Sequence, residues 1–372
     1  INTGVQNTIL GGLAGDSLTS GSYNVALGYA ALSAEDTGNR NIAIGFQALV
    51  SQNIDGDIYN IAIGHNAGSS ITSGVKNTII GGLAGDALVE GGENVAIGYF
   101  ALSGEDGHGK NVAIGNEALK VQNADADAYN VAIGYQAGLA VSTGAYNTLI
   151  GGLAGDALTT GAENIAIGYA ALSTEDGNGK NVAIGVNALE DLNAGADAYN
   201  IAIGHDAGRN VSTGTGNTIA GGLAGDALTT GFENVAIGYN ALGGDVAGAE
   251  NVAIGRGAMS GTTNARANMA IGYNALASLT YGSLTYSHNI GIGFNAGTNV
   301  TSGLKNVLIG GLAGDALVEG SENIAIGYEA LSAENAHGKN VAIGHNALKV
   351  QDAGADARNV AIGYQAGYDL TT

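Results

Sequence analysis

Aromatic side chains recur at one position of a repeated motif, and exposed aromatics can bind the apolar faces of sugars or the surfaces of proteins. The motif reads Asn-aliphatic-Ala-Ile-Gly-x-x-Ala, and the residue five positions after its Asn is often Tyr or Phe. A row of tyrosines offers a large contact area at modest entropic cost. The simpler interpretation, which we favour, is that these rings only cover a corner beside the Gly. The tyrosines considered for ligand binding are Tyr29, Tyr99, Tyr169, Tyr239 and Tyr328.

An insertion that interrupts the repeat holds the second group of binding candidates. Residues 278–286 read Ser-Leu-Thr-Tyr-Gly-Ser-Leu-Thr-Tyr and lie in the long spacing between the copies of the motif that begin at Asn268 and Asn289. Here the array widens into a non-repeating loop, and such loops commonly carry function. We therefore expect Tyr281 and Tyr286 to contribute to specific recognition.

Carboxylates in the longer connections could supply oxygen ligands to Ca²⁺. Segments 55–57 and 125–127 read Asp-x-Asp, whereas the equivalent segments 194–197 and 353–356 each keep a single Asp. Glu-Asp pairs, the first of which begins at Glu35, occupy other connections. Because a required metal site would not lose ligands in this way, we expect solvated loop charge. Weak Ca²⁺ binding is the alternative, and no other metal or cofactor is expected.

Histidines at the position of the tyrosines are the remaining residues suited to catalysis. A general base needs a nucleophile or a substrate proton within reach, and no Ser or Asp recurs beside His65, His205 and His345. We expect these histidines to be surface variants of the tyrosines. The sequence therefore predicts no catalytic residues and no enzymatic activity.

The composition excludes several classes of protein. The 372 residues include 65 Gly but no Pro, Cys or Trp, and the net charge is −21. Without Cys there is no disulfide framework and no thiolate metal site. Strong acidity argues against binding to nucleic acids or anionic membranes, which need clustered Lys and Arg. No apolar run approaches the roughly 18 residues of a membrane span, so we expect no membrane insertion.

The motif itself organises the whole chain. It occurs 21 times, and the spacings between its successive Asn residues follow the order 17, 17, 19, 17, so that four copies form one super-repeat. We number positions from the Asn of each copy, which is position 0. A single elongated array over residues 1–372 is expected. Its super-repeats cover residues 7–76, 77–146, 147–216, 217–305 with an inserted copy, and 306–372 in part.

A short, β-branched apolar run closed by Gly predicts one buried strand in each copy. Positions +1 and +3 are aliphatic and share one face of the strand, so we expect them to fill the interior. Position +2 faces the other way but is usually Ala, which indicates that this second face is also covered. Stacked copies would form a parallel β-solenoid of about 21 coils, an all-β fold.

The Asn and Gly columns fit such a stack. An Asn amide can bond its neighbour in the next coil, and Gly at position +4 suits a corner with positive φ or close backbone approach. Proline, which would remove a donor from the hydrogen-bond ladder, is absent. The ladder positions that represent the second coil of each super-repeat are Asn24, Asn94, Asn164, Asn234 and Asn323.

The coil that opens each super-repeat departs from the pattern in a correlated way. Position +2 becomes bulky while position +5 becomes Gly, as expected if volume is conserved across the corner. We interpret the bulky residues as periodic anchors in a subunit interface, and a local bend of a monomeric solenoid is the alternative. These anchors are Ile9, Ile79, Leu149, Ile219 and Leu308.

The repeated unit, such as Asn-Val-Ala-Ile-Gly-Tyr-Gln-Ala-Gly at residues 130–138, resembles the repeats of two kinds of fibrous protein. One is the head of trimeric autotransporter adhesins of the YadA type, and the other is the repeat array of phage tail fibres. The resemblance implies a left-handed β-roll and a side-by-side homotrimer. Residues 63–67 also resemble the hexapeptide pattern of left-handed β-helix acyltransferases, but only one hexapeptide per coil matches here.

These observations favour an extracellular rod, on a cell surface or a virion tail, that mediates or presents attachment. Its partners would be other copies of the chain and a glycan or protein receptor. A rod of this kind multiplies weak contacts through avidity. A structural filament that binds no receptor is the first alternative, and a hexapeptide-type acyltransferase is the second.

Overall fold

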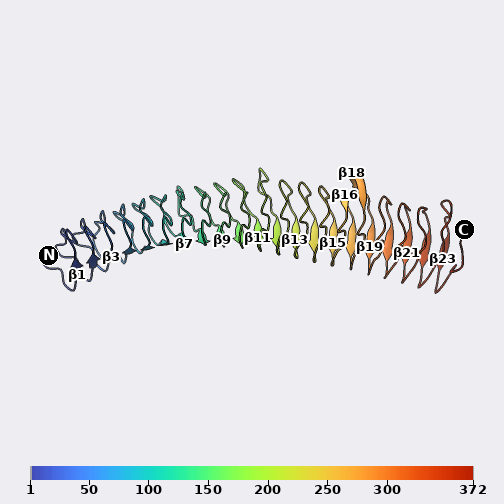
Figure 1. Cartoon of the computed structure of the whole chain (residues 1–372), viewed down its shortest axis with the longest axis horizontal. Helices are drawn as coiled ribbons and strands as arrows, with labels where there is room; N and C mark the ends of the chain where they lie inside the picture. The colour runs from blue at the N-terminus through green and yellow to red at the C-terminus, as the bar shows by residue number, and fades with distance from the viewer. Residues whose placement is uncertain (1, 372) are drawn as a thin grey trace. The chain divides into compact units, whose positions relative to one another are not determined.

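The structure, a computed structural model, describes residues 2–371 and is an all-β parallel β-solenoid. Each copy of the motif forms one three-residue strand, and the chain returns to the next strand after one coil (Figure 1). The described residues form no helix, and so none that could cross a membrane. The chain divides into two units, Ile1–Asn181 and Val182–Thr372.

The described residues of the first unit form ten coil strands, and strands that follow one another in sequence pair in parallel. The strands are β1 (Thr8–Leu10), β2 (Val25–Leu27), β3 (Ile42–Ile44), β4 (Ile61–Ile63), β5 (Thr78–Ile80), β6 (Val95–Ile97), β7 (Val112–Ile114), β8 (Val131–Ile133), β9 (Thr148–Ile150) and β10 (Ile165–Ile167). Equivalent motif positions face each other in every pair, as in Ile165 opposite Thr148.

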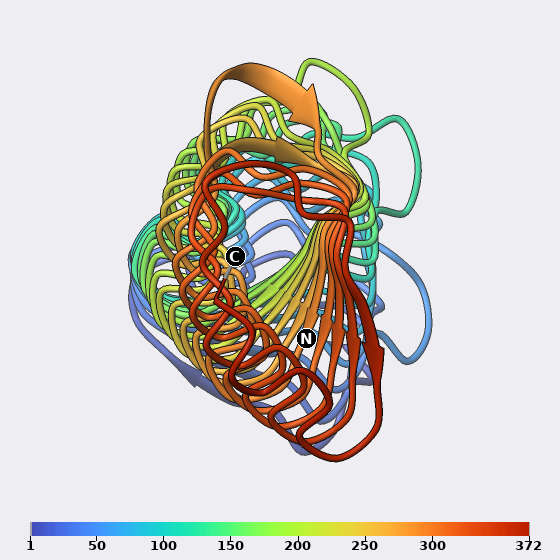
Figure 2. The same cartoon turned by 90° about the vertical axis from the view of Figure 1, so that its right-hand side faces the viewer.

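In the second unit, the residues that the structure describes form eleven coil strands and a separate pair of strands. The coil strands are β11 (Val182–Ile184), β12 (Ile201–Ile203), β13 (Thr218–Ala220), β14 (Val235–Ile237), β15 (Val252–Ile254), β17 (Met269–Ile271), β19 (Ile290–Ile292), β20 (Val307–Ile309), β21 (Ile324–Ile326), β22 (Val341–Ile343) and β23 (Val360–Ile362). The pair consists of β16 (Thr263–Arg266) and β18 (Thr280–Tyr286). In Figure 2, β18, drawn in orange, projects beyond the neighbouring coils of this unit.

Backbone hydrogen bonds join each coil to the next on both sides of the strand. The Thr148 N–H donates to the Asn164 carbonyl at 2.8 Å, and the Gly168 N–H donates to the Ile150 carbonyl at 2.8 Å. Equivalent bonds recur in successive coils of each unit. The one-coil-per-copy prediction is therefore confirmed within each unit.

The predicted orientation of the strand residues was wrong. Alanines at position +2, such as Ala26 and Ala166, are fully buried, whereas the side chains at +1 and +3 are only partly buried. The interior is narrow because the chain turns straight after the strand and places positions +7 and +8 against +2. At Gly291, which replaces this Ala, an added Cβ would lie only 2.6 Å from Leu276. Position +2 therefore has room only for a small side chain where a Leu at position +8 packs against it.

The bulky residues at +2 are core residues, which corrects their assignment to a subunit interface. Four of them have no exposed surface within the single chain: Ile79, Leu149, Ile219 and Leu308. The fifth, Ile9, lies in the first coil and is half-buried. Side chains without exposed surface cannot contact another subunit.

The space for these bulky residues comes from position +8, not from the Gly at +5. Position +8 is Leu in many coils but Gly in the opening coils. A Cβ added to Gly155 would lie 2.8 Å from a methyl group of Leu149. Volume is thus conserved inside the coil, and the Gly at +5 needs another explanation.

Glycine at position +4 is required for two reasons, which confirms the prediction for this column. Gly151 has φ +135°, and a Cβ there would lie 2.3 Å from the Gly168 carbonyl oxygen of the next coil. Its neighbour Gly152 has no such φ, and a Cβ there would meet the Tyr169 ring at an ordinary 3.6 Å.

Non-glycine residues also adopt positive φ at the corners, which the sequence did not indicate. Examples are Tyr146 at position −1 (φ 61°), Leu153 at +6 (φ 59°) and Leu172 at +8 (φ 55°). Such conformations cost about 1–2 kcal/mol each. The coil-to-coil hydrogen bonds must offset this cost.

Adjacent glycines provide a direct test of the corner geometry. Gly151→Ala is expected to lower the free energy of unfolding by about 3 kcal/mol or more, because it combines a disfavoured φ with a backbone clash. Gly152→Ala should change it by less than about 1 kcal/mol. Denaturant unfolding followed by circular dichroism measures both, and equal effects would contradict this account of position +4.

Candidate functional site

The tyrosines at position +5 form part of an exposed column that runs from coil to coil within each unit. Their exposed fractions lie between 49 and 56 % for Tyr29, Tyr99, Tyr169, Tyr239 and Tyr328. Where consecutive coils carry rings, the rings stack. Phe46 lies between Tyr29 and His65, with ring centroids 5.6 and 5.2 Å apart and interplanar angles of 15° and 8°. The predicted alignment of these rings is confirmed within each unit.

Glycines interrupt the aromatic column once in each super-repeat. An added Cβ at Gly12, Gly82, Gly152, Gly222 or Gly311 would lie 3.3–3.7 Å from the ring of the Tyr in the following coil. The Gly at +5 therefore lies outside the core, beside the ring column. It leaves one ring position vacant between neighbouring aromatic side chains.

The insertion does not present both of its tyrosines to solvent. Tyr281 in β18 is buried, and its hydroxyl donates to the Gly303 carbonyl at 2.9 Å. Because it fills the interior beside Asn289, Tyr281 cannot contact a ligand, which corrects its assignment. Tyr286 is 53 % exposed, but the Arg266 guanidinium lies 4.2 Å from its ring centroid.

A second exposed column at position −1 was missed by the sequence analysis. Arg40 lies between Tyr23 and Tyr59, 5.1 and 5.6 Å from their ring centroids, and Tyr129 stacks on Tyr146 at 5.6 Å. The available signal was the residue before each Asn, which is frequently Tyr, Lys, Arg or Glu. Positions −1 and +5 thus border the strand on its two sides.

Carboxylates of the Asp-x-Asp loops are paired with basic side chains of the preceding coil. Asp57 pairs with Arg40 at 3.4 Å, and Asp127 pairs with Lys110. Lys110 and a backbone N–H lower the pKa of the Asp127 carboxyl. Among the described residues, no group of three or more His, Asp or Glu side chains is arranged to hold a metal ion. One Asp of each Asp-x-Asp loop, Asp57 or Asp127, therefore already has a basic partner.

The acidic residues at position +11 of their coils are buried, contrary to the expectation of solvated charge for the Glu-Asp pairs. Glu35, Glu105 and Glu175, which each begin such a pair, have no exposed surface, and neither do Glu334 and Asp245 at the same position of later super-repeats. Loop N–H groups donate hydrogen bonds to these carboxyl groups, and a Gln side chain donates as well to Glu35 and Glu334. The signal for this was the fixed place of these acids at position +11 of their coils.

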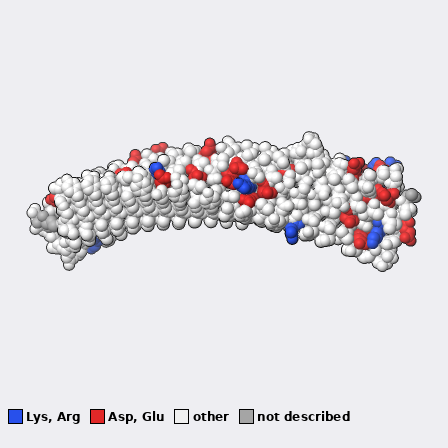
Figure 3. All heavy atoms as spheres, in the orientation of Figure 1, with Lys and Arg blue, Asp and Glu red and all other residues white. Residues whose placement is uncertain are grey.

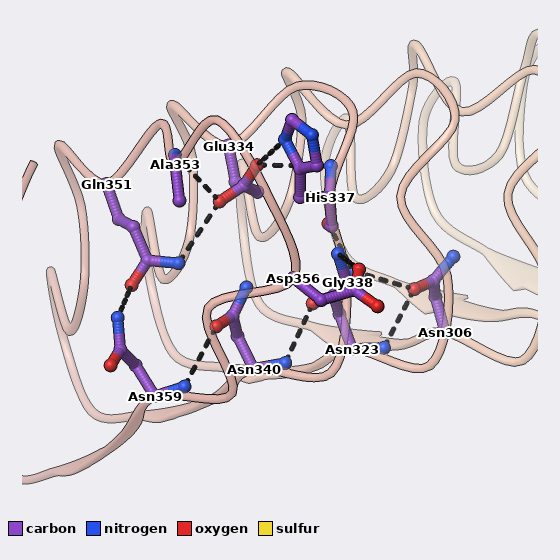
Figure 4. A network of polar contacts seen from close by, with 10 residues as sticks. All are labelled: Asn306, Asn323, Glu334, His337, Gly338, Asn340, Gln351, Ala353, Asp356 and Asn359. Atoms are coloured by element: carbon purple, nitrogen blue, oxygen red, sulfur yellow. Dashed lines mark hydrogen bonds and ion pairs between the residues drawn. The ribbon is translucent and has the colours of Figure 1, made fainter. Parts of the chain in front are cut away.

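Figure 4 shows one of these buried networks at the C-terminal end of the second unit. Glu334 accepts hydrogen bonds from the His337 N–H at 3.2 Å and from the Gln351 side chain at 3.1 Å. The Gln351 oxygen in turn accepts from the Asn359 amide at 2.9 Å. The carboxylate is thereby connected to the asparagine ladder.

The asparagine ladder is confirmed. Each backbone N–H of Asn24, Asn94, Asn164, Asn234 and Asn323 donates to the Oδ1 of the preceding Asn at 2.9–3.0 Å. The Nδ2 group donates to a carbonyl further along the same coil, as from Asn234 to Gly248 at 2.7 Å. Each Asn thus joins two coils and fixes the end of its own coil.

Histidines at position +5 belong to the ring column, as expected. His65 stacks on Phe46, and His345 lies between Tyr328 and Tyr364 at 5.5 and 5.4 Å. His205 contacts Asp206 at 2.9 Å, but the residue after the histidine is not acidic in the coils of the other two. The contact between a histidine and the acidic residue after it therefore occurs at His205 but has no equivalent at His65 and His345.

Removing one rung of the ladder should be costly. Asn234→Ala is expected to lower the free energy of unfolding by about 2–3 kcal/mol, because the Asn251 N–H loses its acceptor at Oδ1 and the Gly248 carbonyl loses a donor. The exposed Asn53 provides the control, since Asn53→Ala should stay within about 0.5 kcal/mol. Equal unfolding midpoints for the two variants would refute the role of the ladder.

Asp245 should make stability depend on pH. Burial raises its pKa to about 6, although the N–H groups of Asn264 and Gly248 oppose this shift. The pKa of Asp245 is higher in the folded than in the unfolded chain. The contribution of Asp245 to the free energy of unfolding is therefore greatest below about pH 4 and falls as the pH rises through 6. At pH 7 the ionised carboxylate costs about 3 kcal/mol.

Asp245→Asn is therefore expected to raise the melting temperature at pH 7 and to leave it nearly unchanged at pH 4. The comparison with the unsubstituted chain at each pH removes the contribution of all other carboxylates. Asp125→Asn, at an exposed position, is the matched control. A constant difference in melting temperature from pH 4 to 7 would contradict the raised pKa.

Comparisons with known proteins identify no relative. No family model, curated protein or solved structure matches the chain. Functional conclusions therefore depend on the repeated motif and on the geometry of its exposed columns.

Proposed function

We propose that the chain is the rod of an extracellular fibre, on a cell surface or a virion tail, that assembles as a side-by-side homotrimer and mediates or presents attachment. The single observation that carries this proposal is the face formed by positions +1 and +3. Nearly every coil places two aliphatic or Thr side chains there, and they are partly exposed in the single chain.

This aliphatic face has the properties of a subunit interface. It is continuous over the coils of each unit, and Ile201 and Ile203 keep 40 and 44 % of their surface exposed. In Figure 3 the strand side of the first unit is largely free of charged side chains, whereas Asp and Glu gather on the opposite side. Continuous apolar surfaces of this kind mark interaction sites in soluble proteins. The interface is thus proposed at +1 and +3, in place of the buried side chains at +2.

The resemblance to fibre repeats supports three copies and left-handed winding as parts of the same proposal. Attachment, to a glycan or protein receptor, is supported by the exposed columns at −1 and +5, which lie beside the aliphatic face. The alternative, a structural filament without receptor binding, would use the same aliphatic face for its assembly. It would differ from the attachment rod in that its copies also join end to end. The observed ring column does not favour a hexapeptide-type acyltransferase.

Native mass spectrometry of the chain at micromolar concentration tests the assembly. We expect a species of three times the chain mass. Ile203→Lys with Ile237→Lys places two charges on the aliphatic face and should give monomers, because buried unpaired charges are costly. Val121→Lys with Val246→Lys, at exposed connection residues, should leave the trimer intact.

A monomeric unsubstituted chain would overturn the proposed interface. Negative-stain images of the same sample separate the two fibre functions. Particles of uniform length agree with an attachment rod, whereas open-ended filaments would favour the structural alternative.

A further inference from the structure

The glycine interruptions of the ring column create a recurring vacancy of defined size. In the described residues, four glycines at +5 have a ring in both the preceding and the following coil. These are His65–Gly82–Tyr99, Tyr135–Gly152–Tyr169, His205–Gly222–Tyr239 and Phe294–Gly311–Tyr328. Neighbouring strands are about 4.8 Å apart, so the two coils that carry the flanking rings are about 9.6 Å apart. Each vacancy therefore has room for one six-membered ring.

The chain itself contains the filled version of this arrangement. Phe46 occupies the middle position between Tyr29 and His65, and it stacks on both. Phe46 keeps 44 % of its surface exposed, whereas Tyr135 and Tyr169, which face a glycine, keep 57 and 56 %. The flanking rings at a glycine thus present uncovered faces that another ring would cover at ordinary stacking distances.

We propose that each of these four glycine vacancies is a binding slot for one neutral pyranose of β-gluco configuration, held between the two flanking rings. This inference rests on the proposed attachment function and names its ligand class. A sandwiched ring needs two apolar faces and a polar rim that stays in water. β-Glucopyranose meets this requirement because its hydroxyls are all equatorial and both faces carry axial C–H groups.

The charge of the chain selects for neutral sugars. A net charge of −21 disfavours sulfated or carboxylated glycans. Two of the slots, at Gly82 and Gly152, lie four coils apart in the first unit. At a separation of about 19 Å the two slots are independent of each other, so each is expected to bind its own oligosaccharide.

Cellohexaose, a neutral β-1,4-linked glucan, is the probe for these slots. Calorimetry and saturation-transfer NMR on the full chain should detect binding at four sites. β-1,4-Mannohexaose, whose 2-hydroxyls are axial, should bind at least fivefold more weakly because one face is no longer apolar. Equal affinity for the two sugars, or no binding of cellohexaose, would overturn the proposal.

Filling the slots provides the decisive variant. Gly82→Phe, Gly152→Phe, Gly222→Phe and Gly311→Phe together supply the missing ring and should reduce cellohexaose affinity at least tenfold. The backbone accepts a side chain there, since a Cβ makes only ordinary or slightly tight contacts. The matched control places Phe at four loop glycines: Gly107, Gly177, Gly282 and Gly354. Unchanged affinity in the filled variant would refute the slots.

Two further measurements keep the outcome interpretable. If the filled variant does not fold, Tyr169→Ala with Tyr239→Ala should lower the number of sites from four to two. Native mass spectrometry of the same samples reports the trimer independently. If the chain is a trimer but does not bind cellohexaose, the proposed slots are wrong and the proposed fibre function stands. If the chain is a monomer that binds cellohexaose, only the proposed fibre assembly is wrong.

Discussion

Stacking of successive coils in register, with neighbouring strands about 4.8 Å apart, is the constraint on which the other features depend. Backbone bonds at positions +1 and +4 hold the strands, and the buried Asn at position 0 joins each coil to its neighbour. Because every coil adds the same rise, any residue type at a fixed position becomes a column. Core, aliphatic face and ring column are all consequences of that translation.

Column formation explains how much the sequence could predict. The 21 copies of the motif and their spacing were sufficient for the solenoid, for the asparagine bonds and for the corner glycines. These features depend on backbone geometry, which each copy repeats. The alignment of rings at position +5 followed from the same translation.

Predictions that depended on which side chains face the interior of the coil were wrong. Alternation along a strand separates +2 from +1 and +3, but it does not say which side faces inward. Two-sided apolar strands such as 165–167 offer no polar face to decide it. Glu35 looked solvated because its hydrogen-bond partner Gln52 lies 17 residues further along the chain and becomes a neighbour only after the coil closes. Tyr281 was misplaced for the same reason, since its partner Gly303 lies in the following coil.

The buried carboxylates have a consequence for how so repetitive a chain selects its own pairing. In a uniform array, a strand could pair with the wrong copy and lose few contacts, which invites misalignment between nearly identical segments. The column at position +11 changes from coil to coil, as in Leu88, Glu105, Gln122 and Val141. A shift by one coil would take Glu35 away from Gln52, which donates a hydrogen bond to it from the next coil. The buried residue at position +11 therefore distinguishes a coil from its immediate neighbours while the chain folds.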